Sequence, residues 1–479
     1  MDFYGRTELL QQLHDLWGKR VSSLVTCRGR RRIGKSTLIE RFAAKSKARF
    51  IKIEGLRPDA NTKKEDELDA FASQLAAQTT AENSRPADWL RAFIRLSKEI
   101  RPREKTVVLL DEVSWMAHGD PLFAATLKIA WDNYLKKNDR LVFVVCGSVS
   151  TWIRENIIES GAFYGRRSLD IVVPELPLHE CVKFWGEAAG RTAVRDIIDV
   201  LSVTGGVPRY LEEVNPHLSA RDNIRNMCFL PKAPLRVDFD EMFYDVITRQ
   251  PKFSAKVLRA LVDGARSVTE IASLLDVGKG GNITNAMAQL EESGMVASDT
   301  GKNPVTGADV RERRYRLRDN YSRFYLKYIE PAKNVIDAKA FEFGGLDRFA
   351  GWDTVMGLQF ENLVVNNYRY LLEPLHMDGA MIVSAAPYFR RGGANGKPKG
   401  CQIDFLIQAK MSICIVEIKR QAHIGREIIE ELRDKSRRLP HPRDVSIHTA
   451  LVYEGELAPS VEADGFFDAL VPFERLLGI

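Results

Sequence analysis

The sequence has no C-x-x-C pair, because its six cysteines stand singly along 479 residues. This scatter argues against a zinc ribbon and against a disulfide framework. No apolar run approaches the ~18 residues needed to cross a bilayer. The N-terminal stretch MDFYGRTELL has no basic segment followed by an apolar one, so it does not resemble a signal peptide. These absences predict a cytoplasmic protein with no membrane partner.

The chain also lacks a strong charge of either sign. Seventy Lys and Arg residues oppose 64 Asp and Glu residues, which gives a net charge of +6 and a pI near 8.8. This mildly basic balance is compatible with nucleic acid but does not demonstrate binding. The hydrophobic content of 45% and the charged content of 28% are those of an ordinary globular protein. The length predicts several domains, since single cores stop growing near ~250–300 residues.

The first ~215 residues alternate β-rich runs with helical patterns, which is typical of a parallel sheet covered by helices. The expected strands are residues 22–29, 49–55, 106–112, 140–148 and 168–176. From about residue 218 the pattern becomes helical and irregular. A long helix over about residues 352–372 opens a final α/β section. The predicted fold class is therefore α/β.

A phosphate-binding motif lies between the first expected strand and the helix that follows it. The segment GRRRIGKS at residues 29–36 matches G-x-x-x-x-G-K-[ST] in the context that this motif requires. Glycines let backbone N–H groups surround phosphate, Lys35 neutralises the β/γ charge, and Ser36 ligates Mg²⁺. The sequence thus predicts ATP and Mg²⁺ as ligands. The residues expected to line the nucleotide are Gly29, Arg30, Arg31, Arg32, Ile33, Gly34, Lys35, Ser36 and Thr37.

An acidic pair ends the third expected strand, TVVLLDE. Asp111 is placed to hold the Mg²⁺ shell, and Glu112 to activate the attacking water. A glutamate directly after the aspartate favours ATP hydrolysis over phosphate transfer, and so disfavours a P-loop kinase. An acidic strand end alone would be unremarkable, but the phosphate-binding motif gives it a role.

Two further features of this region have open interpretations. Ser148 ends the fourth expected strand, where it either senses the γ-phosphate or the attacking water, or simply ends the strand. Arg166 and Arg167 either supply an arginine finger to a neighbouring subunit's nucleotide or form a solvated basic pair. The finger interpretation would imply self-association through these two residues.

The order of the segments FYGRTELLQQL, GRRRIGKST, LLDEVSWM, VVCGSVSTW, FYGRRSLDIVVPELPL and TGGVPRYLEEV resembles the archaeal-type ATPases. These belong to the STAND branch of the AAA+ superfamily, and the likeness covers about residues 1–250. The resemblance implies that Tyr4, Gly5 and Arg6 lie near the adenine. It also implies that the Gly206-Val207-Pro208 element, and Pro208 in particular, sits by the nucleotide from a helical lid.

Two helices at Val268–Leu275 and about Asn282–Ser293, followed by a turn-rich hairpin, resemble a winged helix. Basic residues gather in and after the hairpin, which favours contact with DNA phosphates. The second helix has little Arg or Lys, which argues against strong base readout. The alternative is a spacer that binds only protein. The basic residues are Lys302, Arg311, Arg313, Arg314, Arg316, Arg318, Arg323 and Lys327.

Near the C-terminal end, GCQIDFLIQAKMSICIVEIKR forms two apolar runs that carry charges. In a β-hairpin of residues 402–408 and 412–420, alternation puts Glu417 and Lys419 on one face, with Asp404 on the partner strand. Carboxylates so close repel each other unless a divalent cation lies between them, and Mg²⁺ or Mn²⁺ prefers such hard oxygen ligands. Lys419 can then orient the attacking water. The alternative is that Glu and Lys only cap an exposed strand edge.

The pattern D-x₁₂-E-x-K resembles the PD-(D/E)XK nuclease core, and the region behind the winged helix resembles the DUF234-type C-terminal region. Families of this kind add an acid from a preceding helix, and Glu361 occupies that place. The resemblance implies metal ligands at Glu361, Asp404 and Glu417, with Glu417 and Lys419 in catalysis. Basic residues of the loop at 390–400 offer a grip on the DNA backbone.

The predicted architecture has four parts: a P-loop ATPase core (1–217), a helical lid (218–250), a winged helix (251–335) and a nuclease-like domain with a restriction-endonuclease-like α/β fold (336–479). The expected function couples a nucleotide switch to DNA binding and metal-dependent DNA cleavage or processing. The alternative is a regulatory STAND-type ATPase whose last domain binds a partner and cuts nothing.

Overall fold

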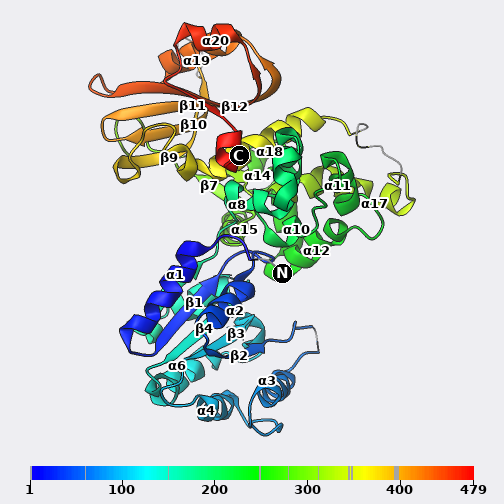
Figure 1. Cartoon of the computed structure of the whole chain (residues 1–479), viewed down its shortest axis with the longest axis vertical. Coiled ribbons are helices and arrows are strands. Elements are labelled where there is room, and N and C mark those ends of the chain that lie inside the picture. Colours follow the sequence, from blue (N-terminus) through cyan, green and yellow to red (C-terminus); the bar gives the residue numbers. More distant parts are fainter. Residues whose placement is uncertain are drawn as a thin grey trace. The chain divides into compact units, whose positions relative to one another are not determined.

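The computed structural model describes residues 3–59, 61–148, 150–247, 250–278, 280–310, 312–342, 346, 349–392 and 399–479. The chain divides into two compact units, Met1–Leu176 and Pro177–Ile479. Figure 1 colours the chain along the sequence, from blue at the N-terminus to red at the C-terminus. No helix among these residues is both long and apolar enough to cross a membrane.

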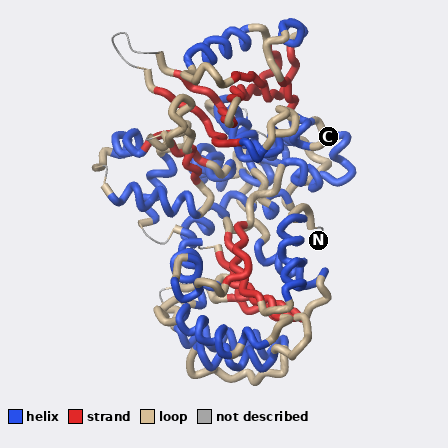
Figure 2. Tube along the Cα trace, turned by 90° about the vertical axis from the view of Figure 1, so that its left-hand side faces the viewer, coloured by secondary structure: helices blue, strands red, loops and turns tan. Residues whose placement is uncertain are grey.

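The first unit is built on a five-stranded parallel sheet in the order β2-β3-β4-β1-β5. All five strands predicted from the sequence are present, and Figure 2 shows them in red with helices packed around them. The apolar runs of the three central strands suit parallel strands that are buried on both faces, while the edge strands β2 and β5 are partly exposed. The strands are β1 (Ser23–Arg28), β2 (Arg49–Glu54), β3 (Thr106–Asp111), β4 (Leu141–Gly147) and β5 (Arg167–Val172).

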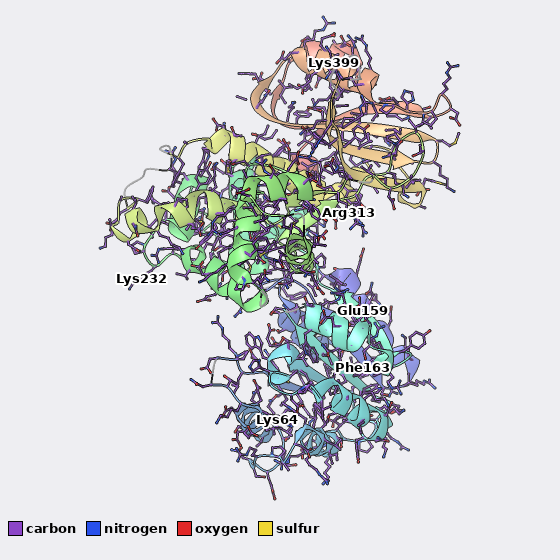
Figure 3. All side chains as sticks on the ribbon, turned by 180° about the vertical axis from the view of Figure 1, so that it is seen from behind. Lys64, Glu159, Phe163, Lys232, Arg313 and Lys399 are labelled. Carbon is purple, nitrogen blue, oxygen red and sulfur yellow. The ribbon has the colours of Figure 1, made fainter. Side chains whose placement is uncertain are left out.

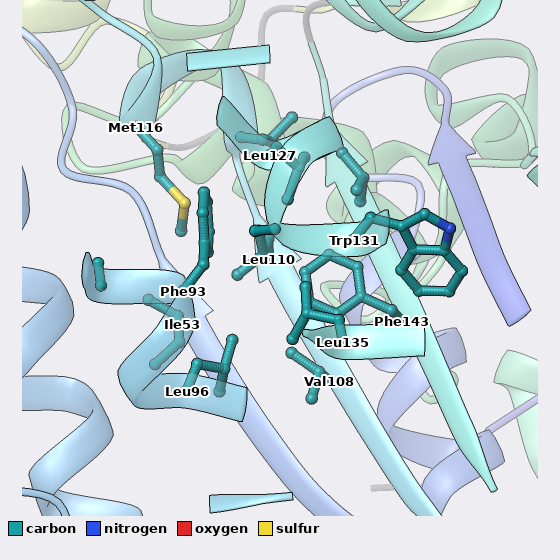
Figure 4. Packing of buried hydrophobic residues seen from close by; sticks show 14 of the residues in the cluster. Ile53, Phe93, Leu96, Val108, Leu110, Met116, Leu127, Trp131, Leu135 and Phe143 are labelled. Carbon is teal, nitrogen blue, oxygen red and sulfur yellow. The ribbon is translucent and has the colours of Figure 1, made fainter. Parts of the chain in front are cut away.

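One face of this sheet packs on a helical layer through a large apolar cluster (Figure 4). Val108, Leu110 and Phe143 point from the strands toward Phe93 and Trp131 of the helices, and all five are buried. This packing fixes the strand ends, where the phosphate-binding motif lies. The helices of the unit are α1 (Thr7–Asp15), α2 (Lys35–Lys45), α3 (Lys64–Gln78), α4 (Trp89–Glu99), α5 (Val113–Met116), α6 (Phe123–Asn133) and α7 (Ser150–Ile153).

The second unit begins with a helical array. Residues 177–217, which the sequence analysis placed with the ATPase core, pack in this unit, where α9 contacts α11, α16 and α18. The four-part division itself stays a prediction. The helices are α8 (Leu178–Cys181), α9 (Val194–Thr204), α10 (Pro208–Leu211), α11 (Ala220–Cys228), α12 (Pro234–Val246), α13 (Pro251–Arg259), α16 (Asn320–Phe324) and α17 (Glu330–Asp337).

The predicted helix pair is present as α14 (Val268–Leu275) and α15 (Gly281–Glu292). Ser267 caps α14, since its hydroxyl accepts from the Glu270 N–H while the Glu270 carboxylate accepts from the Ser267 N–H. An antiparallel sheet in the order β6-β8-β7 stands beside the pair. Its strands are β6 (Arg266–Ser267), β7 (Val296–Asp299) and β8 (Arg314–Leu317).

The C-terminal part of the second unit holds a mixed sheet in the order β13-β12-β11-β10-β9. Strands β9, β10 and β11 are antiparallel neighbours, whereas β11, β12 and β13 run parallel. The preceding helix ends at Asn366, earlier than predicted, and a 3₁₀ turn follows it. The elements are α18 (Trp352–Asn366), β9 (Ile382–Arg390), β10 (Cys401–Ala409), β11 (Ser412–Ile424), α19 (Glu427–Arg438), β12 (Ser446–Leu457), α20 (Pro459–Asp464), β13 (Ala469–Pro472) and α21 (Glu474–Leu477).

Candidate functional site

The phosphate-binding loop joins β1 to α2 and depends on its glycines. Gly29 has φ of +151°, and a Cβ added there would lie 2.7 Å from the Val173 carbonyl oxygen. Gly34 has φ of +84° and directly precedes α2. Both backbone conformations are ones that side chains disfavour. The loop therefore takes its shape from glycine at these two positions.

Lys35 points back into the loop from the first turn of α2. Its ammonium group donates to the carbonyl oxygens of Gly29 at 3.2 Å and Arg30 at 3.1 Å. The residue is only 6% exposed. Its positive charge therefore lies inside the curve of the loop, beside the N-terminus of α2, where anions are favoured.

Ser36 and Asp111 meet at the C-terminal end of the parallel sheet. The Ser36 hydroxyl donates to Asp111 Oδ2 at 2.5 Å, although the residues are 75 positions apart in the sequence. Asp111 is 4% exposed at the end of β3. A hydroxyl and a carboxylate are hard oxygen donors of the kind that Mg²⁺ binds. This pair therefore fits the magnesium ion that the motif predicts.

Lys52 is a charged neighbour of this pair that the sequence analysis missed. Its ammonium group lies 3.5 Å from Asp111 Oδ2 and 3.2 Å from Glu40 Oε1. Burial lowers the pKa of Lys52, but Asp111 and Glu40 together raise it above its ordinary value. The only signal in the sequence was a lysine inside the strand RFIKIEG, next in the sheet to the strand that ends in Asp111.

Glu112 and Ser148 are brought together from two neighbouring strand ends. The Ser148 hydroxyl donates to the Glu112 carboxylate at 2.8 and 2.9 Å, and the Ser148 N–H donates to it at 3.1 Å. Glu112 has φ of +49°, an uncommon conformation for a residue with a side chain. Ser148 is thus placed to orient Glu112. Whether it also senses phosphate or water stays a prediction.

Several other residues that were predicted to line the nucleotide make contacts within the first unit. The Arg6 guanidinium donates to the carbonyl oxygens of Ile33 at 3.4 Å and Glu175 at 3.3 Å. Arg30 lies 4.0 Å from the Glu175 carboxylate, and the Arg31 guanidinium lies 5.8 Å from the centre of the Trp115 ring. Tyr4, Gly5 and Arg32 are half-buried, while Thr37 is exposed on α2.

Arg166 and Arg167 are both engaged within their own chain. Arg166 makes two bonds of 2.9 Å to Asp132, and it holds the pKa of that carboxyl well below its usual range. Arg167 pairs with Asp170 and donates to the Ile158 carbonyl at 3.2 Å. The arginine-finger role of these residues, and the self-association that it implies, stay predictions. Pro208 begins α10 in the second unit.

In the second unit, β10 and β11 form the predicted hairpin. Phe405 pairs with Val416, so the register places Asp404 opposite Glu417. Asp404 Oδ2 accepts a 3.0 Å hydrogen bond from the Ile418 N–H. Glu417 is fully buried, although its strand runs to the surface. The two acids thus converge as the alternation along the strands predicts.

Two ammonium groups, rather than one, meet the buried glutamate. Lys419 lies 2.9 Å from Glu417 Oε1, as the sequence analysis expects. Lys435 of α19 lies 2.7 Å from both Glu417 oxygens and 3.0 Å from Glu431 Oε1. The sequence analysis missed Lys435 and Glu431, because their helix reaches the sheet only in the folded chain.

A cleft of about 440 Å³ opens beside these groups, and Glu361 lines it together with Asp404 and Glu417. Burial raises the pKa of all three carboxyl groups. The pKa of Asp404 rises to about 6, with a further contribution from the charge of Glu361. The pKa of Glu417 rises to about 7, with a further contribution from the charge of Asp404. Such shifts cluster at functional sites. We call the set Glu361, Asp404, Glu417, Lys419, Glu431 and Lys435 the acid–lysine cluster.

The acid–lysine cluster does not fit a divalent ion as it is arranged. Its donor oxygens are of the right kind, but Lys435 takes both oxygens of Glu417. Among the residues that the structure describes, no three His, Cys, Asp or Glu side chains form a group able to hold a metal ion. The predicted ligands share one cleft, yet the closest cations to Glu417 are ammonium groups.

Many of the basic residues predicted to contact DNA instead form ion pairs within the second unit or are buried there. Arg316 donates to Asp299 at 3.1 Å, and Arg314 lies 3.0 Å from Glu270. Arg323 is 3% exposed. The exposed Arg313 is labelled in Figure 3. Other pairs join Lys302 to Asp309 and Lys327 to Asp263, Arg318 is half-buried, and Arg311 lies outside the described residues.

The predicted grip at residues 390–400 is also partly engaged. Arg390 donates to the carbonyl oxygens of Arg438 at 2.8 Å and Lys399 at 3.2 Å. Arg391 lies 3.1 Å from Glu270. Lys397 lies outside the described residues. These contacts engage guanidinium N–H donors that would otherwise be available to a phosphate backbone.

Comparisons with known proteins agree on the nucleotide-binding part. A family model for ATPase domains predominantly from Archaea matches residues 3–214. An uncharacterized protein of Methanocaldococcus jannaschii is 22% identical over 369 residues, which cover 75% of this chain and 76% of the relative.

One solved structure supports the same fold. A Walker-type ATPase of Pyrococcus abyssi superposes with a TM-score of 0.52 and 16% identity, covering 68% of this chain and 96% of that one. The ORC2 protein of Aeropyrum pernix reaches a TM-score of 0.43 at 15% identity, covering 71% and 96%, which is too distant to carry an argument. The chain thus carries a P-loop ATPase domain, as its phosphate-binding motif predicts.

Proposed function

We propose that this protein is a nucleotide-controlled switch in which ATP hydrolysis at the phosphate-binding loop acts on a second unit that processes DNA. The observation that carries the first half is the 2.5 Å contact between Ser36 and Asp111. It joins the first turn of α2 to the end of β3. Mg²⁺ bound with the nucleotide phosphates would need both the Ser36 hydroxyl and the Asp111 carboxylate at this place. The second half rests on the acid–lysine cluster.

In the ATPase step, Lys35 and the loop N–H groups bind the β- and γ-phosphates. Ser36 and Asp111 would hold Mg²⁺, which when bound neutralises charge on these phosphates. Glu112 takes a proton from the attacking water, whose oxygen then bonds to the γ-phosphorus. The bond to ADP breaks, and inorganic phosphate leaves. Ser148 holds the Glu112 carboxylate through two donors, which keeps it in one orientation.

The ATPase half is tested by measuring phosphate release with and without DNA. We expect Glu112→Gln to lose hydrolysis while it retains ATP binding, because the amide keeps the shape of the carboxylate and cannot accept the proton. Stimulation of the wild type by DNA would tie the two units together. Equal rates for wild type and Glu112→Gln would contradict the assigned role.

Contacts within the second unit support a route by which a nucleotide response would reach the acid–lysine cluster. Helix α9 ends at Thr204, directly before the Gly206–Pro208 element, and packs on α18, which carries Glu361. Asp199 of α9 pairs with Arg420, the residue after Lys419. Arg420 also lies 3.3 Å from Glu454. A shift of α9 therefore acts on both elements that supply the cluster.

For the cluster, we propose metal-dependent cleavage of DNA in a state that differs from the one described. Three acids and Lys419 in one open cleft support it, whereas Lys435 on Glu417 opposes it. The winged-helix and DUF234-type assignments of the second unit belong to this proposal, and its helix pair with the β6-β8-β7 sheet supports the first of them.

The competing function is a STAND-type regulatory ATPase whose last domain binds a partner and cuts nothing. The inward-facing arginines and the ammonium groups on Glu417 favour it. Incubating supercoiled plasmid or single-stranded DNA with Mg²⁺ or Mn²⁺ separates the two functions. Cleavage lost in Glu417→Ala and Lys419→Ala supports the nuclease. Absence of cleavage in the wild type under every nucleotide condition leaves the regulatory function.

A further inference from the structure

We infer that Lys435 is an internal counter-cation that competes with a divalent metal ion for Glu417, so that this lysine sets the metal affinity of the acid–lysine cluster. The inference rests on the proposed function, since it concerns the regulation of the same cleft. It assigns a role to a residue that lies outside the D-x₁₂-E-x-K pattern.

The first observation is that the cluster already holds a cation at its most buried acid. The Lys435 ammonium lies 2.7 Å from each oxygen of Glu417, whose side chain is fully buried. The Lys435 side chain is 17% exposed, so it approaches from the cleft rather than from the core. Lys435 thus occupies both Glu417 oxygens, and Lys419 shares Oε1 at 2.9 Å, so a metal ion would have to displace an ammonium group.

The second observation is a charge imbalance that the two lysines of the cleft do not remove. The cleft is lined by four carboxylates, those of Glu361, Asp404, Glu417 and Glu431, and by the ammonium groups of Lys419 and Lys435. Arg420 also lines it, but its guanidinium is engaged by Asp199 and Glu454. When all four carboxyl groups are ionised, four negative charges against two positive ones leave room for a divalent cation to balance the site.

The third observation is that Lys435 has a second partner to move to. Glu431 lies one turn earlier on α19, its Oε1 is 3.0 Å from the Lys435 ammonium, and its side chain is 44% exposed. A pair at this i, i+4 spacing persists on the helix surface. Lys435 can therefore leave Glu417 through a side-chain rotation and keep an ion pair. The exchange needs no unfolding of α19.

Lys419 shares Glu431 as a partner, at 3.3 Å, but it meets Glu417 differently from Lys435. Lys419 stands on β11 itself, two residues after Glu417, and its ammonium group lies 2.9 Å from Glu417 Oε1. It can stay beside Glu417 while another cation approaches the remaining oxygen. Lys435 contacts both oxygens and must leave first. The two lysines thus have separate roles: one accompanies the acid, and the other occupies the place of the metal ion.

The test is a Mn²⁺ titration of the full chain followed by electron paramagnetic resonance of free Mn²⁺. The set is wild type, Lys435→Met, Lys435→Met with Glu417→Gln, and Arg437→Met as a matched control. Arg437 is an exposed cation on the same helix. We expect Lys435→Met to bind one Mn²⁺ at least tenfold more tightly than wild type. The added Glu417→Gln should abolish this gain, and Arg437→Met should leave the affinity unchanged.

Unchanged Mn²⁺ affinity in Lys435→Met would overturn the inference, as would a gain that persists when Glu417 is also changed. If Lys435→Met fails to fold, Lys435→Gln keeps a hydrogen-bond donor for Glu417 while removing the charge. A thermal-unfolding titration of this variant with Mn²⁺ gives a second readout, because a ligand that binds only the folded state stabilises it by mass action.

The same proteins distinguish failure of the inference from failure of the proposed function. A Mn²⁺ site gained by Lys435→Met without plasmid cleavage in any variant would sustain the inference and refute the nuclease. Cleavage by wild type and by Lys435→Met with equal Mn²⁺ dependence would sustain the nuclease and refute the role of Lys435.

Discussion

The two acidic sites of this protein neutralise their carboxylates in different ways. In the first unit, Asp111 and Glu112 accept hydrogen bonds from the hydroxyls of Ser36 and Ser148. In the second unit, Glu417 is held by ammonium groups at 2.7 and 2.9 Å. Hydroxyls satisfy oxygen lone pairs without adding charge, whereas ammonium groups cancel the charge as well.

This difference indicates which of the two sites is arranged to bind an added cation. At the phosphate-binding loop the nearest ammonium to Asp111 is that of Lys52 at 3.5 Å, which leaves the carboxylate with most of its negative field. At the acid–lysine cluster the protein supplies its own cations at closer range. The loop is therefore arranged for nucleotide and Mg²⁺, whereas, on the inference drawn above, Lys435 must move before the cluster can bind a divalent ion.

The largest expected effect is that of Lys35→Ala, which removes the ammonium group that points into the phosphate-binding loop. ATP hydrolysis should fall by at least about 1,000-fold, because both phosphate binding and charge stabilisation are lost. Phosphate release measures it. Lys45→Ala, at the exposed end of the same helix, is the control and should keep the wild-type rate.

Glu112→Gln should lower the rate of hydrolysis by about 100-fold, with ATP affinity retained, because the general base is lost. Ser148→Ala should have a smaller effect in the same direction, since it only frees the orientation of Glu112. Single-turnover rates and binding of a labelled ATP analogue measure both. A larger loss for Ser148→Ala than for Glu112→Gln would show that the serine contacts the nucleotide itself.

The acid–lysine cluster should make the second unit less stable as pH rises. Burial raises the pKa of Glu417 from 4.5 to about 7, so the folded state binds more protons than the unfolded state between these values. Stability is then greatest below pH 4.5 as far as this group is concerned, and it is lost as pH rises through 7. Urea unfolding at pH 5 and pH 7.5 measures the slope.

Glu417→Gln should flatten that slope, because the amide does not titrate. A wild-type slope of the opposite sign would mean that Lys435 and Lys419 outweigh burial. Glu417 would then be charged in the folded state throughout, and the cluster would be a plain ion pair. This outcome would sharpen the contrast with the hydroxyl-bonded acids of the first unit.

The smallest effect is expected at the pair that links α9 to β11. Asp199 and Arg420 have side chains that are 24% and 11% exposed. A double-mutant cycle with Asp199→Asn and Arg420→Met should give a coupling free energy of unfolding of about 1 kcal/mol. Zero coupling would remove the proposed route between α9 and the cluster, while leaving the ATPase site untouched.

Features that depend only on residues close together in the sequence could be predicted from the sequence pattern. The phosphate-binding motif gave the loop, and alternation along β11 gave the shared face of Glu417 and Lys419. The five parallel strands followed from apolar runs of the right length. The exposure of the basic residues after α15 could not be predicted from the sequence, because their acidic partners lie on other elements. Asp299 and Glu270 pair with Arg316 and Arg314 only in the folded chain.

The sequence alone was sufficient to predict the phosphate-binding loop, since its glycines, Lys35 and Ser36 lie within one eight-residue segment whose backbone geometry is local. It also determined that acids and a lysine would meet on one hairpin. Only the tertiary structure decided what neutralises them. Lys435 comes from a helix that crosses between β11 and β12, and a buried charge takes its partner from whatever the fold packs beside it.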